Sequence, residues 1–354
     1  MHYSIRALGL VGSLAFAFLN GCASHPSRQA LEFESGESIV LVAESPANLA
    51  FTPAPSQPIT VRSTYRDNLP QTIHYQPGVD YSIGPSGQIR RAPHSRIPDF
   101  GTNMLYGKED FRHDQFPGFG NRAFFVYVDY FHPGTWNRPP TNPALGAALL
   151  PKTKQKLAAG EAVRIVAFGD SITAGGDASE PALIFWQRWA DALQHEYPRA
   201  KIQAINGATG GDATVQGLQR LPAKVLQEKP DLVLIGFGMN DHNRPGYGVP
   251  VDTFSQNLET LIDRIRADTG AEVVLFSAFP PNPKWHFGSH NMEAYANATE
   301  AVARDKNCAF ADVYHLWIAA ASKKKPEDLL ANNINHPNDY GHWIYFRALQ
   351  SLGL

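Results

Sequence analysis

The sequence of 354 residues is poor in cysteine and has almost no net charge. Its two cysteines are Cys22 and Cys308, and no group of cysteines and histidines has the spacing of a zinc site, so no metal is expected. The formal net charge of −2 gives no electrostatic basis for binding nucleic acid. The one short basic run, Lys323–Lys325, is typical of a solvated helix end. A hydrophobic content of 43% indicates a globular protein, long enough for two domains.

Long apolar runs are also scarce, and the clearest one opens the chain from Ala7 to Leu19. It is too short to span a bilayer and has the pattern of the apolar region of a secretory signal. The stretch Leu19-Asn20-Gly21-Cys22 resembles a bacterial lipobox, which implies cleavage before Cys22 and acylation of its thiol. An ordinary signal peptide that happens to contain a cysteine is the alternative. Residues 1–22 are therefore expected to be a signal peptide that directs a lipid-anchored protein to the bacterial envelope or periplasm.

No later segment is apolar enough to span a membrane, so membrane contact is expected only through this anchor. With Cys22 lipidated or removed, Cys308 has no partner for a disulfide within the chain. Cys308 lies in an apolar stretch and is expected to be a small buried hydrophobic residue.

The distribution of proline divides the chain, because more than half of the prolines lie before residue 150. In this part, strand-forming runs such as Ile59–Ser63 and Phe124–Tyr130 are short. Turn signals such as Pro77-Gly78 and Pro117-Gly118 separate them. Residues 23–135 are predicted to form a small β-rich, sandwich-like domain, and residues 136–160 a linker.

From residue 161 to residue 354 the pattern changes to repeated strand, loop and helix. Apolar strands are predicted at residues 163–168, 201–206, 232–237, 272–279 and 308–313. A helix is predicted between a capping residue, Asp252, and a terminating Gly270, with one apolar face made of Phe254, Leu258, Leu261, Ile262 and Ile265. This alternation predicts a parallel sheet covered by helices on both faces.

Polar and small residues follow the first three of these strands. The three loops contain Gly169–Thr173, Asn206–Asp212 and Gly238–Asp241. Because the carboxyl ends of parallel strands lie along one edge of a sheet, these loops are expected to converge. A serine on a tight turn can serve as a nucleophile, while glycine N–H groups and an asparagine amide can stabilise a negative oxygen. The arrangement fits acyl transfer.

Together with His336-Pro337, these loops resemble the four sequence blocks of the SGNH (GDSL-type) hydrolase superfamily, in the same order. The resemblance covers residues 161–354 and implies a flavodoxin-like, three-layer α/β/α fold that works without a cofactor. It implies that Ser171 is the nucleophile and that His336 is the base. It also implies an oxyanion hole formed by Ser171, Gly211 and Asn240, although Gly210 competes with Gly211 for that role.

The sequence departs from the family where an acid should orient the histidine. Most members have an aspartate three residues before it, and here that residue is Asn333. A carbonyl of Asn333 or of the backbone can take the place of the acid, as in the Ser–His dyads of the family. A carboxylate from elsewhere can also replace it, and Asp339 is the nearest in sequence, although capping the following helix is its expected role. Loss of catalysis is the third alternative.

The predicted function is hydrolysis of O-acetyl or other short acyl esters, on a small molecule or a polysaccharide. The two-domain layout resembles that of carbohydrate esterases in the family. Asp170, Arg244, Trp285 and Phe287 are candidates for substrate contact; the alternatives are that Asp170 braces its loop and that the two aromatic residues pack theirs. Two other functions are kept open: a carbohydrate-binding lipoprotein with an inactive hydrolase domain, and an O-acyltransferase.

Overall fold

The computed structural model describes residues 31–134 and 143–354, all within one compact unit, Leu31–Leu354. The predicted signal peptide, Cys22 and residues 136–142 of the predicted linker lie outside the described residues. Within the two described ranges, no helix combines the length and the apolar character needed to cross a bilayer.

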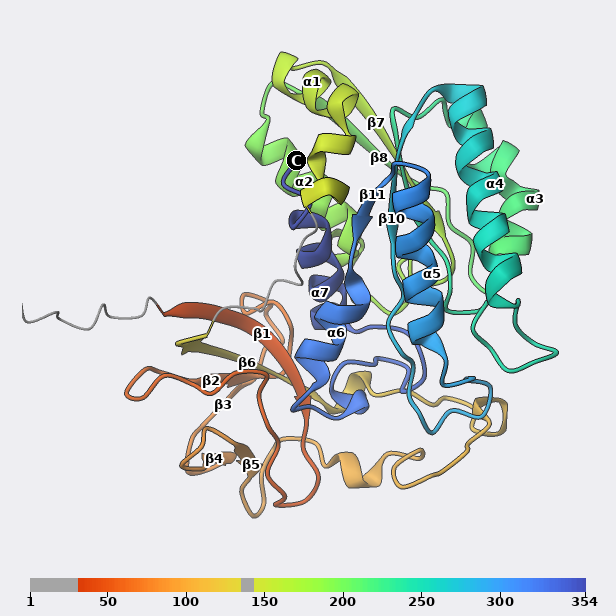
Figure 1. The fold of residues 1–354 in the computed structure, drawn as a ribbon. Coiled ribbons are helices and arrows are strands. Elements are labelled where there is room, and N and C mark those ends of the chain that lie inside the picture. The colour runs from red at the N-terminus through yellow and green to blue at the C-terminus, as the bar shows by residue number, and fades with distance from the viewer. Residues whose placement is uncertain (1–30, 135–142) are drawn as a thin grey trace, which may run out of the picture. The chain divides into compact units, whose positions relative to one another are not determined.

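A parallel five-stranded sheet forms the centre of the carboxyl-terminal part (Figure 1). Its order is β11-β10-β9-β7-β8, and all neighbouring strands run parallel. The five strands are β7 (Ala162–Gly169), β8 (Lys201–Asn206), β9 (Leu232–Gly236), β10 (Glu272–Phe276) and β11 (Ala309–Ala311). The five predicted strands and their parallel arrangement are therefore confirmed.

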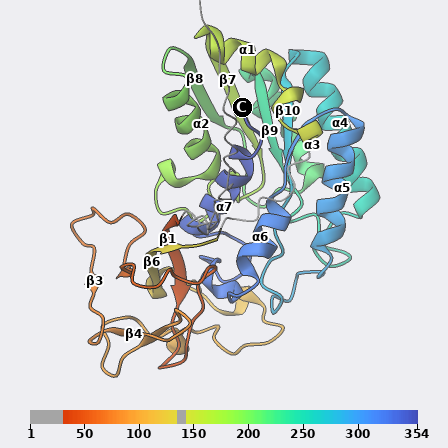
Figure 2. The same ribbon diagram turned by 60° about the vertical axis from the view of Figure 1, so that its left-hand side comes forward.

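Helices cover both faces of this sheet (Figure 2). The chain moves outward from β7 to β8, returns across β7 to β9, and then continues to β10 and β11. Because such crossovers are right-handed, the reversal places α2 on one face and the next three helices on the other. The helices are α1 (Pro151–Ala159), α2 (Phe185–Glu196), α3 (Thr214–Lys224), α4 (Val251–Thr269), α5 (Met292–Asp305), α6 (Val313–Ala321) and α7 (Asp339–Gln350).

The predicted apolar stripe of α4 is buried in full: Phe254, Leu258, Leu261, Ile262 and Ile265. Gly270 ends the helix in the left-handed conformation, as predicted. The prediction that Asp252 caps this helix is wrong, because the helix begins at Val251 and Pro250 occupies the cap position. Asp252 lies in the first turn, where its charge still complements the helix dipole.

The amino-terminal part is β-rich, as predicted. A four-stranded antiparallel sheet has the order β1-β6-β2-β3, and β4 and β5 form a separate hairpin. Tyr81 and Ile89 of the hairpin share one apolar core with Ile39 and Val128 of the sheet. The strands are β1 (Glu32–Val40), β2 (Thr60–Arg62), β3 (His74–Tyr75), β4 (Tyr81–Ile83), β5 (Ile89–Arg91) and β6 (Phe125–His132).

Buried polar contacts join β1 to the segment that follows α6. The ammonium group of Lys324 lies 2.6 Å from a carboxylate oxygen of Glu37, and neither side chain is exposed to solvent. The carboxylate of Asp328 accepts the backbone N–H of Val40 at 2.7 Å. The interpretation of Lys323–Lys325 as a solvated helix end is therefore wrong for Lys324. Its charge is paired in the interior, where removal of either partner would leave a buried unpaired charge.

Candidate active site

Ser171 follows the carboxyl end of β7, at the edge of the sheet where the predicted loops converge. Gly169 ends the strand beside Gly236 of β9, and a Cβ at this glycine would lie 2.1 Å from the carbonyl oxygen of Gly236. Only glycine therefore lets the two strands approach each other immediately before the serine. The Oγ atom of Ser171 lies 2.8 Å from Nε2 of His336, across 165 residues of sequence.

The turn before His336 is held by the side chain of one residue. The side-chain oxygen of Asn332 accepts three backbone N–H groups, those of Ile334, Asn335 and His336, each at 2.9 Å. The carbonyl oxygen of His336 in turn accepts the N–H of Ala331 at 2.9 Å. The backbone that carries the imidazole is thus fixed before a substrate arrives.

The carboxylate beside His336 belongs to Asp177, a residue that sequence analysis did not select. Its Oδ2 atom lies 2.8 Å from Nδ1 of His336. Because an ionised carboxylate only accepts hydrogen bonds, Nδ1 carries the proton, and Nε2 is left to accept the hydroxyl proton of Ser171. The three side chains are linked in the order of a Ser–His–Asp triad.

Neither residue predicted to orient His336 occupies that position. Asn333 is buried, and its side-chain oxygen accepts from the amides of Asn121 at 3.2 Å and Asn282 at 3.3 Å. Asp339 accepts the backbone N–H of Ser179 at 2.8 Å and is the first residue of α7. The predicted capping role of Asp339 is also wrong by one residue, since Asn338 is the cap.

Contacts with both Arg122 and His336 hold Asp177 in place. Its backbone has a φ of 62°, which aspartate tolerates better than most residues. The guanidinium group of Arg122 donates to its carbonyl oxygen at 3.1 Å and to Oδ1 at 3.3 Å. Burial acts to raise the pKa of the Asp177 carboxyl, but the hydrogen bond and charge of His336, with the charge of Arg122, outweigh it. The pKa therefore lies below its ordinary value, and the carboxylate stays ionised.

The loop that carries Asp177 is packed closely against the imidazole. A Cβ at Gly176 would lie 2.8 Å from the carbonyl oxygen of Ser171 and 3.1 Å from Nδ1 of His336. From the other side, Nε2 of the buried His342 lies 3.1 Å from the carbonyl oxygen of Gly176. Burial lowers the pKa of His342 to about 3, so this histidine is a neutral structural donor rather than a second base.

Hydrogen-bond donors without acceptors surround the serine. The backbone N–H groups of Ser171, Gly210 and Gly211 make no hydrogen bond within the described part of the chain. The side-chain amide of Asn240 donates to the carbonyl of Asp212 at 2.8 Å and retains a second hydrogen. Donors of this kind can hold the negative oxygen of a tetrahedral intermediate. Both Gly210 and Gly211 border the same cavity as Ser171, so the choice between them stays open.

A cavity of about 590 Å³ opens at Ser171 and His336. Its walls come from the loops after β7, β8, β9 and β10, from the turn before His336, and from the segment between β5 and β6. The lining residues beyond the predicted loops include His113, Phe119, Asn243, Tyr247, Asn332, Ile334 and Asn335. His113 and Phe119 precede the α/β part by more than 40 residues, and no motif in the sequence marks them.

The four candidates for substrate contact have different positions. Trp285 and Phe287 line the cavity, although Trp285 is only 5% exposed and packs against Phe111. Arg244 is absent from the lining and forms an ion pair with Asp110 at 3.2 Å. Asp170 is buried and accepts the backbone N–H of Ile172 at 3.0 Å, so it braces the loop and is not placed to touch a substrate.

The burial of Asp170 predicts a pH dependence of stability. Burial, and then the nearby charge of Asp241, raise the pKa of the Asp170 carboxyl to about 7 from an ordinary value of 3.8. Between these values the folded state binds more protons than the unfolded state, so this residue lowers stability as the pH rises. In Asp170→Asn the amide oxygen can still accept from Ile172. The melting temperature of the variant, relative to the wild type, should rise by about 5 °C or more from pH 4 to pH 8. A difference that stays constant across this range would contradict the prediction.

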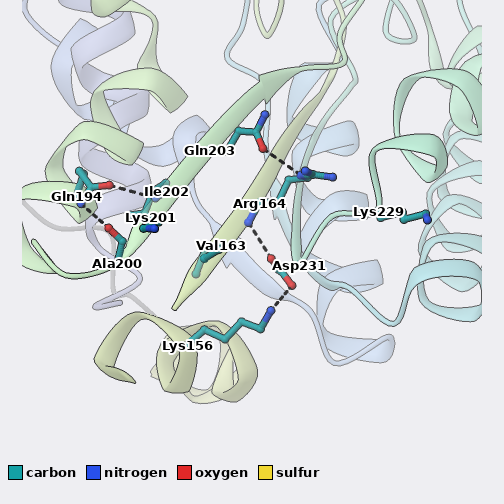
Figure 3. A pocket seen from close by; sticks show the side chains of 11 residues that line it. Lys156, Val163, Arg164, Gln194, Ala200, Lys201, Ile202, Gln203, Lys229 and Asp231 are labelled. Atoms are coloured by element: carbon teal, nitrogen blue, oxygen red, sulfur yellow. Dashed lines mark hydrogen bonds and ion pairs between the residues drawn. The ribbon is translucent and has the colours of Figure 1, made fainter. Parts of the chain in front are cut away.

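A second cavity of about 590 Å³ lies at the opposite, amino-terminal ends of β7 and β8 (Figure 3). Residues 162–164 and 201–203 form its floor, and Lys156 pairs there with Asp231 at 2.7 Å. No serine, cysteine or histidine lines it. Ser171 and His336 are found together only in the first cavity among those described.

Comparison with known proteins agrees with this geometry. Residues 167–344, about half of the chain, match the GDSL-like Lipase/Acylhydrolase family. A stretch of 142 residues is 37% identical to an arylesterase of Vibrio mimicus and covers 39% of this chain and 66% of that protein. Esterase TesA of Pseudomonas aeruginosa is 33% identical over 148 residues, 41% of this chain and 67% of that one.

A solved structure with a similar fold is that of a two-domain esterase active on acetylated mannans, co-crystallized with mannopentaose. The TM-score is 0.50 and the sequence identity 23%, over 59% of this chain and 54% of that chain. The chain thus spans about two thirds of the length of the two curated relatives and about half of the length of the structural one. The similarity to the curated relatives covers only about two fifths of this chain.

Proposed function

Because the chain belongs to the GDSL-like Lipase/Acylhydrolase family, we propose that it is a serine ester hydrolase that uses Ser171, His336 and Asp177. The observation that carries the proposal is the pair of 2.8 Å contacts that link the hydroxyl of Ser171, the imidazole of His336 and the carboxylate of Asp177. These contacts lie beside backbone N–H groups that have no acceptor in the described chain.

The proposed reaction has two stages. Oγ of Ser171 attacks the ester carbonyl while Nε2 of His336 takes its proton, and the carbonyl oxygen becomes negative. The N–H groups of Ser171 and of Gly210 or Gly211, with the amide of Asn240, hold that oxygen. His336 then protonates the departing alcohol, and the acyl group remains bound to Oγ of Ser171. In the second stage a water attacks the acyl-enzyme through the same base, which releases the acid and restores the hydroxyl.

Asp177 has two effects in this scheme. Its carboxylate accepts the Nδ1–H, which fixes the tautomer that leaves Nε2 free to take a proton. Its negative charge also stabilises the imidazolium that forms in each stage, and Asp177 itself stays ionised. Arg122 holds the aspartate in register through two hydrogen bonds from outside the α/β part.

We propose a short acyl group, such as acetyl, on a carbohydrate as the substrate. The likeness to the esterase active on acetylated mannans motivates this choice. The mixture of aromatic rings and asparagine side chains along the cavity supports it, since sugars present both apolar faces and hydroxyl groups. We also propose that the protein is secreted and is anchored to a membrane by a lipid on Cys22. Partition of the full-length protein, and of Cys22→Ala, between detergent and aqueous phases would test it.

A serine-directed fluorophosphonate probe and a panel of esters test the function together. The probe should label the protein, and acetyl esters should be cleaved faster than long-chain esters, with acetylated mannan or xylan among the substrates. Cleavage of long-chain esters alone would contradict the proposed substrate but would leave the proposed mechanism unaffected. A folded protein that neither reacts with the probe nor cleaves any ester would overturn the function. Transfer of acetyl to an added sugar, in preference to water, would indicate an acyltransferase instead.

A further inference from the structure

A segment from the β-rich part of the chain forms one wall of the cavity. The backbone N–H of Phe111 donates to the carbonyl of Lys284 at 2.9 Å, and the N–H of His286 donates to the carbonyl of Phe111 at 3.0 Å. Phe111 and Trp285 lie in one buried cluster with Leu105 and Ile334. The segment is therefore fixed to the loop after β10, and it places His113 at the cavity that contains Ser171.

The protonation of the His113 ring is set by a neighbour. The indole N–H of Trp285 lies 3.1 Å from Nδ1 of His113. Because an indole nitrogen only donates, Nδ1 must accept, and the neutral ring carries its proton on Nε2. Burial lowers the pKa of His113 below its ordinary value, although the charge of Asp114 acts in the opposite direction. The neutral ring with an Nε2–H is thus the form expected at neutral pH.

This Nε2–H has no acceptor within the described residues. The ring is nonetheless held firmly, since the rings of Phe119, Trp285 and Phe287 lie around it at centroid distances of 5.5 to 6.0 Å. Nε2 is not among the buried atoms that lack partners, so it is accessible to solvent, and the residue lines the cavity. A donor that is oriented, held and unused in a cavity wall is suited to a polar ligand atom.

A residue with an unused acceptor lines the same cavity. The side-chain oxygen of Asn243 has no hydrogen-bond partner in the described structure, and because it is buried, the side chain must turn toward the cavity before a ligand can reach it. Such groups are rare in folded proteins, and each calls for an explanation. A hydroxyl group both donates and accepts a hydrogen bond, so a substrate with several hydroxyl groups can satisfy both sites. The alkyl or aryl group of a simple ester carries no hydroxyl group and can satisfy neither site.

We propose that His113 and Asn243 form a binding subsite for the hydroxyl groups of a polyhydroxylated substrate, with Nε2–H of His113 as donor and Oδ1 of Asn243 as acceptor. This inference rests on the proposed function and makes it more specific, because it assigns discrimination between sugar esters and simple esters to these two residues. It also gives the β-rich part a direct contact with the substrate. The aromatic rings beside His113 supply an apolar surface for the sugar.

The test compares kcat/KM for an acetylated xylo- or manno-oligosaccharide with kcat/KM for phenyl acetate. The measured quantity is the ratio of the two values, since it cancels general damage to the catalytic residues. His113→Phe keeps an aromatic ring and removes the donor, so the ratio should fall about tenfold, the size expected for one lost hydrogen bond. His113→Gln places an amide donor near the former Nε2 and should restore part of the ratio. Asn243→Ala should lower the ratio in the same direction.

His286→Phe is the matched control, because this histidine lies on the same loop as Trp285 but does not line the cavity. Its ratio should change less than twofold, whereas an equal fall would show that disturbance of the loop is sufficient. An unchanged ratio in both His113→Phe and Asn243→Ala would overturn the subsite while the esterase stands. If the wild type cleaves phenyl acetate and no sugar ester, the subsite is overturned and the serine mechanism is retained. If it cleaves neither, both proposals fail.

Discussion

Ser171→Ala is expected to lower kcat/KM for phenyl acetate by a factor on the order of 10⁶, the loss that removal of the nucleophile causes in serine hydrolases. The alanine leaves the cavity and the N–H groups around it in place, but it removes the hydroxyl oxygen that lies 2.8 Å from Nε2 of His336 and would carry the acyl group. Labelling by the fluorophosphonate probe should vanish in the same variant. Rates with phenyl acetate, together with probe labelling of the same preparations, provide the measurement.

Ser179→Ala is a suitable control for that experiment. Ser179 lies on the same loop but does not line the cavity, and alanine keeps the backbone N–H that Asp339 accepts while it loses the hydroxyl group beside the same carboxylate. Its rate should stay within about twofold of the wild type, as for most surface substitutions. Substantial activity or labelling in Ser171→Ala would mean that another residue attacks the ester, and the proposed mechanism would be abandoned.

Asp177→Asn is expected to lower kcat by about 10⁴, the cost that the same replacement carries in a serine protease triad. The amide can donate to Nδ1 of His336, which favours the tautomer with the proton on Nε2 and prevents that atom from taking the proton of Ser171. The size of the amide is nearly that of the carboxylate, so the loop should keep its conformation. The measurement is kcat and KM for an acetyl ester, with circular dichroism to confirm folding.

Asp339→Asn is the matched control, because it makes the identical chemical change on the His336 side of the site. Its amide oxygen can still accept the N–H of Ser179, so kcat should stay within about tenfold of the wild type. The reverse result, a large loss in Asp339→Asn and little loss in Asp177→Asn, would show that the contact between Asp177 and His336 does not serve catalysis.

The α/β fold could be predicted because its strands are apolar on both faces. Runs such as Val163–Phe168 and Leu232–Phe237 match β7 and β9 within one residue. Buried parallel strands need no alternation of apolar and polar residues, and few other structures tolerate such runs. The first residues of α4 and α7 could not be predicted in the same way. Aspartate is favoured both at the cap and in the first turn of a helix, and Asp252 and Asp339 each lie in the first turn.

The acid of the site could not be found by spacing alone. The family pattern places an aspartate just before the histidine, whereas Asp177 lies six residues after Ser171 and 159 before His336. One signal was present in the sequence: Gly175-Gly176-Asp177 is a tight-turn sequence shortly after Ser171, and Asp177 is the first carboxylate to follow that serine. The contributions of Arg122 and His113 have no such signal, because only the packing of the β-rich part brings them to the site.

Two adjacent residues of the β-rich part support the imidazole–carboxylate pair, one through the turn before His336 and the other by direct contact with Asp177. Asn121 donates to the carbonyl of Leu330 at 2.8 Å and to the side chain of Asn333, in the turn that leads to His336, while Arg122 holds Asp177. Hydrogen bonds that support the site therefore cross the boundary suggested by the change of sequence pattern near residue 161. In a chimaera, a foreign β-rich part would have to supply equivalents of Asn121 and Arg122. Without them, the α/β part would contain Ser171 and His336 but would lack these hydrogen bonds to the turn before His336 and to Asp177.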